Sequence, residues 1–327
     1  MLDAIINNAG MSDTSNTPLA DQTTNQFERL LALNLTAPAA VVDACTTRLK
    51  AGARVVNVAS GAGLHAIPWR GAYSPSKAGL IAQSKALAQA RPDLCVTVLA
   101  PGFVRTELLD SLIQSGRLDP TNATSKIPLG RLAMPAEIAE ALYFLATRDA
   151  APLSGQILAV NGGSSIYGGA YRFPPSALSP LALDLPTGLS IVGGDTTPWQ
   201  DIAPPPNLHE HYPATIDLSP LYESSDNLLR CVHHAGARFK AKHAQQASLT
   251  LLLPSPVSER WQDAGATAAA RMLVSTYACE WGSSGLRINA IEVSPQQNPT
   301  PLHPLLRFVS GARAQYMTGQ TLACNTL

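Results

Sequence analysis

Charged residues are scarce in this sequence, and neither sign is in excess. Lysine plus arginine number 23, aspartate plus glutamate also number 23, and together they form 14% of the 327 residues. A chain without net charge offers no basic stripe to nucleic acid or to an anionic membrane surface, and no nucleic-acid-binding motif occurs in it. We therefore expect neither a nucleic-acid partner nor a membrane partner.

Cysteine and long apolar runs are also scarce. The cysteines form no C-x-x-C pair and are spread along the chain as Cys45, Cys95, Cys231, Cys279 and Cys324. This spacing predicts ordinary thiols in a reducing compartment rather than a disulfide framework or a zinc site. No apolar run approaches the roughly 20 residues of a membrane helix, and the first residues lack the basic leader of a signal peptide. With 46% apolar residues, the composition predicts a globular, cytoplasmic protein.

Strand and helix signals alternate over residues 1–163. Short apolar runs that stop at Asn, Gly or Ser predict buried strands, and longer stretches between them predict helices. The expected strands are LDAIINNAG (2–10), ARVVNVAS (53–60), CVTVLAPG (95–102) and GQILAVNGG (155–163), and the expected helices span residues 24–50, 76–90 and 134–147. This alternation is typical of a parallel α/β sheet.

Proline interrupts the pattern in the middle of the chain, with ten prolines in residues 171–220. Proline lacks the N–H group that a strand donates to its neighbour, so this segment predicts a linker or an irregular wrapping loop. One short strand is expected at LSIVGG (189–194).

The last third of the chain repeats blocks of the first half in the same order. ASLTLLLPSP (247–256) corresponds to ARVVNVASGA (53–62), residues 268–295 correspond to residues 77–102, and TGQTLACNTL (318–327) corresponds to SGQILAVNGG (154–163). Chance similarity between two α/β segments is the alternative, but three blocks in one order favour duplication.

Tyr73 and Lys77 have the spacing of an acid/base pair on one helix face. A carbonyl group that is reduced gains negative charge on oxygen and needs a proton donor held close to it. A tyrosine hydroxyl can supply the proton, and a nearby ammonium group lowers the tyrosine pKa by favouring the phenolate. Residues four apart share a helix face, and Pro75 fits between them only in the first turn of a helix. Alone, this spacing also occurs by chance in many helices.

Further polar residues stand where expected strands end. NNAG (7–10), Ser60 and PGFVRT (101–106) each close an expected strand, and ligands of open α/β sheets bind just outside such ends. Asn34, in LALN, lies within the preceding helix. Taken singly, Asn34 is explained by bonding to nearby backbone and Ser60 by forming a turn.

Together these blocks resemble the short-chain dehydrogenase/reductase family over residues 2–163. They are NNAG, LALN, VVNVAS, YSPSK, LAPGFVRT, IPLGRLAMPAEIAEALYFLA and SGQILAVNGG, in the family's order and approximate spacing. The resemblance implies a Rossmann-like doubly wound parallel sheet and NAD or NADP as cofactor. It also implies an NAD(P)-dependent oxidoreductase that interconverts a secondary alcohol and a ketone, 3-oxoacyl reductase-like, with a small-molecule alcohol or carbonyl substrate.

The resemblance also implies a role for each matching residue. Tyr73 would be the acid/base, Lys77 would lower its pKa and hold the nicotinamide ribose, Ser60 would bind the substrate oxygen, and Asn34 would anchor a water. The expected cofactor contacts, besides Tyr73 and Lys77, are Pro101, Gly102, Val104 and Thr106 at the nicotinamide end and Asn8, Ala9 and Gly10 on the adenosine side.

The family's Gly-rich phosphate loop has no counterpart ahead of Asn7, which only six residues precede. The resemblance therefore implies a sheet that lacks its first βαβαβ half, with LDAIINNAG as an apolar edge strand and doubtful cofactor binding by this chain. LSIVGG and ATIDL (214–218) are the candidates to pair with that edge. Two interpretations stay open, a gene model that starts too late (or a fragment) and an incomplete protein completed by a partner or by its own second half. The alternative function is an inactive remnant or pseudo-enzyme that acts as a structural or oligomerisation partner.

The second half is expected to be a degenerate, non-catalytic repeat. Asp263 and Thr267 fall at the positions of the tyrosine and the lysine, and neither can carry out the proton chemistry. The expected domains are residues 1–168 (catalytic part), 169–220 (Pro-rich linker) and 221–327 (repeat). By analogy with family dimers, helix 266–281 is expected to pack on helix 76–90 as an intrachain pseudo-dimer, and a homo-oligomer is also allowed.

Other polar groups have weaker interpretations. We expect no metal site, because His209, Glu210 and His211 lie in the proline-rich segment without a third spaced ligand, and His233, His234 and His243 fall on a helix surface. His65, Trp69 and Arg70 suit either a substrate mouth or a solvent-facing loop. Leu108, Leu109, Leu112 and Ile113 suit either a substrate lid or an amphipathic helix packed on the core.

Overall fold

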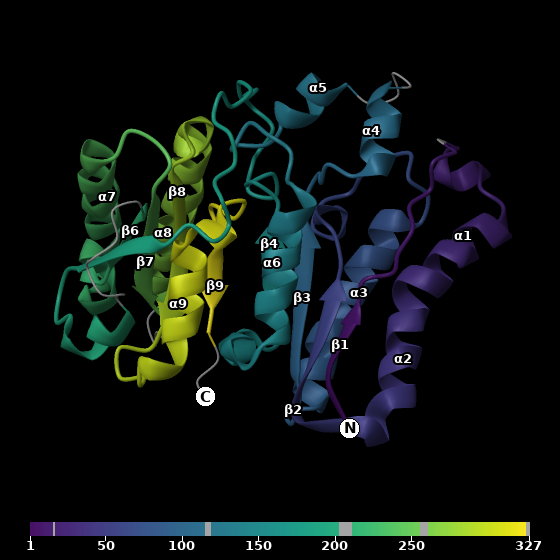
Figure 1. Ribbon diagram of the computed structural model, residues 1–327, viewed down its shortest axis with the longest axis horizontal. Helices are drawn as coiled ribbons and strands as arrows, with labels where there is room; N and C mark the ends of the chain where they lie inside the picture. Colours follow the sequence, from purple (N-terminus) through teal and green to yellow (C-terminus); the bar gives the residue numbers. More distant parts are fainter. Residues whose placement is uncertain (16, 115–118, 203–210, 256–260, 325–327) are drawn as a thin grey trace. The chain divides into compact units, whose positions relative to one another are not determined.

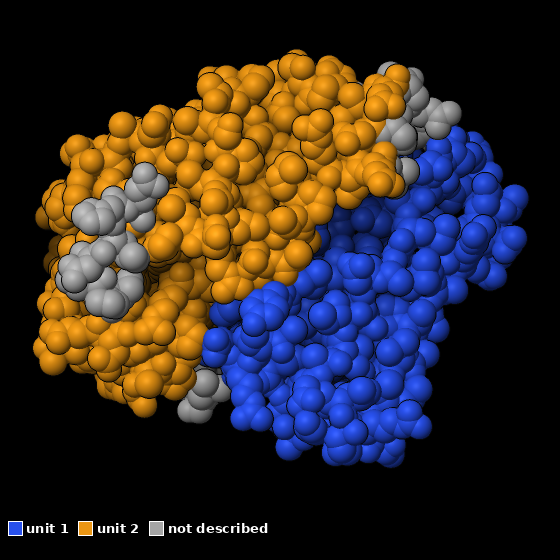
Figure 2. Space-filling model, viewed as in Figure 1, with its two compact units in different colours: residues 1–102, 142–159 blue, residues 103–141, 160–327 orange. Residues whose placement is uncertain are grey.

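The computed structural model describes residues 1–15, 17–114, 119–202, 211–255 and 261–324. It shows an α/β protein whose strands form two separate parallel sheets (Figure 1). The chain divides into two compact units (Figure 2), a first unit of residues 1–102 and 142–159 and a second unit of residues 103–141 and 160–327. The predicted α/β class, with Rossmann-like parallel sheets, is confirmed.

The first sheet has the strand order β1-β2-β3-β4. Its strands are β1 (Leu2–Asn7), β2 (Leu49–Val58), β3 (Cys95–Pro101) and β4 (Ile157–Val160). β1 runs parallel to β2, and β2 runs parallel to β3. Val55 and Val96 are completely buried in the core of this sheet. The four predicted strands of residues 1–163 are therefore present, and their carboxyl ends define one edge of the sheet.

The helices of the first unit begin and end for local reasons. α1 (Thr24–Leu31) starts with a capping box in which Thr23 and Gln26 bond each other's backbone N–H groups. A single wide π turn (Ala32–Thr36) joins it to α2 (Ala37–Cys45). The predicted helix 24–50 ends earlier than expected because Leu49, buried in the core, already belongs to β2. α3 (Tyr73–Ala90) begins three residues before the predicted start, at the tyrosine itself.

β1 is an edge strand, as the sequence predicted, and its apolar Ile6 is 44% exposed. The candidates to pair with it do not do so. Residues 189–192 lie in β5 (Thr187–Val192) and residues 214–217 lie in β6 (Tyr212–Asp217), and these two strands pair with each other in the second sheet. That part of the prediction is wrong, because Ala214 and Ile216 are buried in the core of the second unit.

The second sheet has five parallel strands in the order β5-β6-β7-β8-β9. Besides β5 and β6 they are β7 (Ser248–Pro254), β8 (Arg287–Val293) and β9 (Thr321–Ala323). The helices between them are α7 (Ser225–Lys242), α8 (Trp261–Trp281) and α9 (His303–Ser310). α7 and α8 pack on each other over a core that includes Val232, Leu251 and Ile288.

The described residues between 169 and 220 therefore hold more regular structure than the predicted linker. β5 is the one short strand expected there, whereas β6 was not predicted. Pro213 is tolerated because it is the second residue of β6, close to where the strand begins. The expected boundaries at residues 168 and 221 do not coincide with the two compact units.

The remaining helices lie between β3 and β4 in the chain. α4 (Glu107–Gln114), α5 (Pro120–Thr124) and α6 (Pro135–Ala146) follow β3, and α4 contains the expected amphipathic segment. The side chains of Leu108 and Leu112 lie outside the described residues. Short 3-10 turns are Leu19–Asp21, Thr46–Arg48, Gly61–Gly63, Arg148–Leu153, Thr197–Ile202, Ser219–Tyr222, Gly282–Ser284, Thr300–Leu302 and Ala312–Ala314.

Matching blocks at the ends of the two sheets have the same local geometry. Gly155 donates its N–H to Val96 at 2.7 Å, and Gly319 donates to Ile288 at 2.7 Å. Both glycines have positive φ, 79° and 72°, which other residues rarely adopt. A second bond also recurs, from Val98 to Gln156 and from Ala290 to Gln320. The sequence match between residues 154–163 and 318–327 thus has a counterpart in the backbone.

One helical stretch of the described residues, Thr24–Arg48, is long and apolar enough to cross a membrane, with a mean hydropathy of 1.4. The sequence had predicted no such segment, because no apolar run in it approaches roughly 20 residues. A helix that covers a sheet passes the same test, and α2 contacts β2 in this way. The cytoplasmic location and the lack of a membrane partner stay predictions.

Candidate active site

Tyr73 and Lys77 lie on one face of α3, in its first two turns. The Lys77 Nζ atom is 5.9 Å from the centroid of the Tyr73 ring, within the range of a cation–π contact. Pro75 falls in the first turn, where the backbone N–H it lacks would have no helical partner. The local helix therefore brings the two residues together as their spacing predicted.

Lys77 is a buried cation. Its side chain is only 4% exposed, and Nζ donates a hydrogen bond to the Val58 carbonyl at 2.9 Å. Burial lowers the pKa of Lys77 from 10.5 to about 8, because the charged form loses hydration. At neutral pH an amine with this pKa is still mostly protonated, so Lys77 places a positive charge close to the Tyr73 ring.

Asn34 connects the helical stretch to the chain after β1. It lies in the π turn between α1 and α2 and is 1% exposed. Its side-chain amide donates to the Met11 carbonyl at 2.8 Å and to Ser76 Oγ at 3.0 Å, and its oxygen accepts from the Met11 N–H at 2.9 Å. A π turn widens a helix locally and often marks a functional position. These long-range bonds exclude the simpler reading of Asn34 as a residue bonded to its own helix.

Gly10 lies against both of these residues. A β-carbon placed on Gly10 would be 3.1 Å from Lys77 Nζ and 3.2 Å from Asn34 Oδ1, closer than most real contacts. The backbone of NNAG thus approaches the amine closely at this glycine. Gly10, Asn34 and Lys77 form one cluster, which we call the lysine cluster.

We expect Gly10→Ala to impair the site without unfolding the chain. The added methyl group would displace Lys77 Nζ by a few tenths of an ångström, and small misplacements of a catalytic group reduce rates by about tenfold or more. Turnover and far-UV circular dichroism of the variant would be measured beside Gly168→Ala, because Gly168 has open space around it. Equal turnover of the two variants would contradict this role of Gly10.

Ser60 follows β2 and caps the 3-10 turn Gly61–Gly63. Its Oγ accepts a hydrogen bond from the Ala62 N–H at 3.1 Å, and the residue has an extended backbone. This bond shows the turn-forming role considered in the sequence. A hydroxyl oxygen that accepts one bond still has a proton to donate, so the predicted contact with a substrate oxygen remains open to it.

The predicted cofactor residues are divided between the two units. Asn8, Ala9 and Gly10 are exposed just beyond the carboxyl end of β1, and Pro101 and Gly102 are half-buried at the end of β3. In the second unit, Val104 bridges to Ala133 and Thr106 Oγ1 accepts from the Leu109 N–H at 3.3 Å. Their roles toward a nicotinamide ring stay predictions.

A second polar network, not predicted from the sequence, lies beside the site. Asn57, in the middle of β2, is 3% exposed; it accepts from Asn7 at 2.7 Å and donates to Ser84 at 2.8 Å. Ser84 in turn donates to the Leu80 carbonyl at 2.6 Å. The network fixes α3 on β1 and β2. The sequence held one indication of this network, the single Asn inside the apolar run VVNVAS. A polar side chain buried in such a strand needs a hydrogen-bond partner.

The loop between Ser60 and Tyr73 faces solvent at several positions. Trp69 is 57% exposed and has φ 63°, and His65 is exposed as well. A tryptophan with positive φ is strained. The solvent-facing interpretation therefore describes this loop, and a specificity role stays a prediction.

Among the described residues no group of three His, Cys, Asp or Glu side chains has the arrangement of a metal site. His209 and Glu210 lie outside the described residues. All five cysteines are unpaired thiols. In the second unit Pro254 stands at the position matching Ser60, and the side chain of Asp263 lies outside the described residues.

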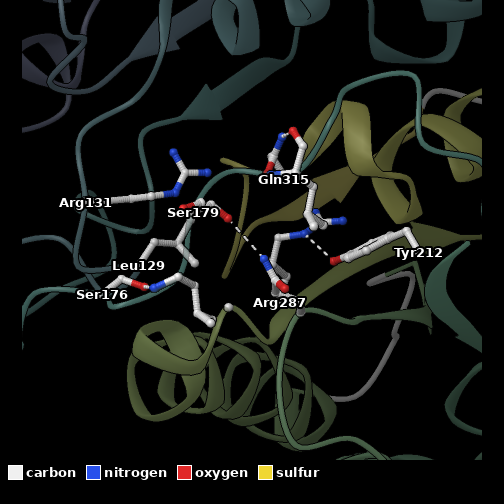
Figure 3. Close-up of a pocket in the computed structure, with 11 residues that line it drawn as sticks. Leu129, Arg131, Ser176, Ser179, Tyr212, Arg287 and Gln315 are labelled. Carbon is white, nitrogen blue, oxygen red and sulfur yellow. Dashed lines mark hydrogen bonds between the residues drawn. The ribbon is translucent and has the colours of Figure 1, made fainter. Parts of the chain in front are cut away.

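A cavity beside the buried Arg287 in the second unit is too small for a substrate (Figure 3). Its volume is about 30 Å³, which is room for one or two waters. Tyr212, Gln315 and Ser179 line it, and Arg287 donates to Tyr212. The candidate chemistry therefore lies at the lysine cluster and Tyr73.

A parallel α/β sheet with a Tyr–Lys helix at its carboxyl edge defines a Rossmann-like protein. Residues 1–165 match the family model of enoyl-(acyl carrier protein) reductases. The chain belongs to the short-chain dehydrogenase/reductase family.

Three relatives give the extent of the similarity. An uncharacterized short-chain type dehydrogenase/reductase, y4vI, of Sinorhizobium fredii is 43% identical over 164 residues, 50% of this chain and 30% of that protein. The acetoacetyl-CoA reductase of an Acinetobacter species is 36% identical over 50% of this chain and 65% of its own length. The 3-oxoacyl-[acyl-carrier-protein] reductase FabG of Rickettsia prowazekii is 34% identical over 50% of this chain and 67% of its own length. The chain thus matches between 30% and 67% of the length of these relatives.

Proposed function

We propose that the first unit catalyses hydride transfer between NAD or NADP and a small alcohol or ketone. The observation that carries the proposal is the buried Lys77 ammonium, held by Val58 and crowded by Gly10, on the helix face of Tyr73. The names of two relatives, an acetoacetyl-CoA reductase and a 3-oxoacyl reductase, favour a 3-oxoacyl thioester as the substrate class.

The residues at the carboxyl edge of the first sheet suit the nicotinamide end of a cofactor. The chain after β1 is exposed at Asn8 to Gly10, just outside a strand end, where dinucleotides bind in open sheets. The Lys77 amine can donate to a ribose hydroxyl. The 327 residues contain no T-G-x-x-x-G-x-G segment of the kind that holds a pyrophosphate.

The protein's contribution to the reaction is proton transfer and orientation. The cofactor, when bound, supplies or accepts the hydride. Tyr73 gives its hydroxyl proton to the substrate oxygen in the reductive direction, and Ser60 donates a hydrogen bond to the same oxygen. Lys77 stabilises the resulting phenolate by its charge. Asn34 fixes the Met11 backbone and Ser76, which keeps the lysine cluster in place.

Tyr73→Phe is expected to lower NADPH-dependent reduction of acetoacetyl-CoA by about 100-fold or more, because the general acid is lost. NADPH binding, followed by its fluorescence, should change less than threefold. Tyr222→Phe is the control, because Tyr222 is 49% exposed and lies in the second unit. Undiminished reduction by Tyr73→Phe would refute the proposed acid.

A second candidate function is an inactive remnant that holds a partner through the β1 edge. The exposed apolar Ile6 on an unpaired edge strand favours it, because such edges pair with other chains. Titration of NADH and of NADPH into the chain, followed by fluorescence, separates the enzyme from the inactive remnant. A chain that binds neither NADH nor NADPH saturably is a remnant, and one that binds and turns over is an enzyme.

We further propose that the second unit is a degenerate repeat whose α8 packs on α3 as a pseudo-dimer. The recurring bonds of Gly155 and Gly319 support the repeat.

A substitution on α8 can test the pseudo-dimer. Ala270 is fully buried in the second unit's own core, so a charge there destabilises the protein with or without a pseudo-dimer. Met272, 65% exposed on α8, is the better probe. Met272→Arg should lower the melting temperature by several degrees relative to Leu229→Arg on α7, and equal melting temperatures would contradict the packing.

A further inference from the structure

We propose that the second unit holds a binding site for a small apolar carboxylate, in a trough between α7 and the face of β5 and β6. This site is separate from the proposed hydride transfer and does not depend on it. Its lining comes from three strands, the turn after β6 and one helix of a single compact unit.

The trough has the size of a small-molecule site. Its volume is about 420 Å³, within the range of ligand pockets. The lining residues are Val192, Gly193, Thr215, Asp217, Ser219, Ala235, Arg238, Phe239, Lys242, His243 and Leu249. On α7 the lining runs from Ala235 to Lys242, which is about 10 Å along a helix, and His243 follows directly after the helix end. A short acyl chain or a single aromatic acid therefore suits it in length.

One side of the trough is apolar. Ala235, Phe239 and Leu249 are buried, and their side chains also belong to the core between α7, α8 and the sheet. Val192, at the end of β5, is 39% exposed. An apolar ligand here would remove the exposed apolar surface of the trough, most of all that of Val192, from water.

The polar side of the trough carries a fixed cation. Arg238 donates from Nη2 to the Asp217 carboxylate at 2.9 Å, and Asp217 is 2% exposed and also accepts from the Ser219 N–H at 2.9 Å. The pairing uses one corner of the guanidinium and leaves its other N–H groups for a ligand. Lys242 lies one helical turn beyond Arg238, on the same face. With one carboxylate against two cations, the lining carries net positive charge, which selects an anion.

His243 supplies an unused polar atom at one end of the trough. Its Nε2 atom is buried and has no hydrogen-bond partner in the described part of the chain. Its ring packs on Phe239 with centroids 4.8 Å apart. A buried polar atom without a partner is costly, and a ligand oxygen that accepts from Nε2–H would remove that cost. The sequence interpretation placed His243 on a helix surface, so this role was not foreseen.

The probe that tests the proposal is octanoate, titrated into the full chain by isothermal calorimetry. We expect saturable binding of one octanoate per chain and a shift of the His243 ring signals in the NMR spectrum. Octan-1-ol, which has the same chain without the charge, should bind at least tenfold more weakly. Lys242→Gln should weaken octanoate binding about tenfold, whereas Lys240→Gln, on the same helix but outside the lining, should leave it unchanged.

A steric variant tests the location independently of charge. Thr215→Phe keeps every charged group and fills the trough from β6, so octanoate binding should be lost while turnover at Tyr73 is retained. Absence of saturable binding to the unsubstituted chain would overturn the proposal. So would binding that Lys242→Gln leaves unchanged, or that a folded Thr215→Phe variant retains. Should Thr215→Phe fail to fold, the Lys242→Gln and Lys240→Gln pair decides.

Discussion

Lys77→Met is expected to abolish turnover and, at the same time, to make the protein more stable at pH 7. The ammonium of Lys77 is 4% exposed and its pKa is lowered to about 8, so the folded chain holds a charge that burial disfavours. The displacement of the pKa from 10.5 corresponds to about 3 kcal/mol of lost stability. Methionine has a similar shape, carries no charge and removes this cost.

One favourable contact is lost in the same substitution. The Lys77 hydrogen bond to the Val58 carbonyl is worth about 1 kcal/mol, so the net gain in unfolding free energy is about 2 kcal/mol. A domain that becomes more stable when a residue is removed keeps that residue for function. The opposite signs of the changes in activity and stability distinguish this role from a structural one.

The stability difference should depend on pH in a defined direction. The folded-state pKa of Lys77 lies below its unfolded value, so the unfolded chain binds more protons between the two values. The cost is fully present below about pH 8 and disappears as the pH rises toward 10.5. The melting temperatures of Lys77→Met and the unsubstituted protein should therefore converge over this interval.

The control for this experiment lies on the same helix. Lys85 is exposed on α3, so Lys85→Met removes one positive charge without relieving burial. It should change stability by less than about 0.5 kcal/mol at every pH. Destabilisation of Lys77→Met at pH 7, or a gap that does not narrow with pH, would contradict the assignment of Lys77 as a strained functional residue.

Much of the first unit could be predicted because its signals are local. The spacing of Tyr73 and Lys77 and the ends of the β-branched runs follow from helix and strand periodicity. Contacts of Gly10 and Asn34 could not be read in the same way. They join residues far apart in the chain, Gly10 to Lys77 and Asn34 to Met11, and only the folded backbone brings these together.

The errors in the second unit have a different cause. β6 was missed because Pro213 and the surrounding prolines indicated a loop, whereas burial of Tyr212, Ala214 and Ile216 in the core decides the conformation. Tertiary burial thus overrode local propensity.

Arg287 is a residue whose importance no sequence motif indicated. It is 1% exposed, and its neighbours among the described residues include no carboxylate within salt-bridge distance. Instead it donates to the Tyr212 hydroxyl and to backbone carbonyls of Val309, Ser310, Gly311, Ala314 and Met317. Most of these carbonyls lie at the carboxyl end of α9 and in the turn after it, where the helix dipole favours a cation.

The matching position in the first sheet shows what this arginine adds. Block alignment places Cys95 opposite Arg287. Cys95 donates weakly from its thiol to the Ala150 carbonyl at 3.6 Å. The first unit therefore has a small thiol at this position of its sheet, whereas the second unit uses one guanidinium to hold α9, β8 and the following turns.

Arg287→Met should destabilise the second unit by about 4 kcal/mol or more. Replacing a buried ion pair by apolar residues can be neutral, but here the acceptors are carbonyls that remain buried and lose their donor. Arg287→Lys keeps the charge but has three donors that diverge from one nitrogen, so it should recover less than half of the loss. Urea unfolding followed by far-UV circular dichroism measures both variants against Cys95→Ala, for which a loss of about 1 kcal/mol is expected. Equal stability of Arg287→Met and Cys95→Ala would contradict this prediction. Apolar packing alone would then hold the second sheet, and the hydrogen bonds from Arg287 to the backbone carbonyls would add nothing to its stability.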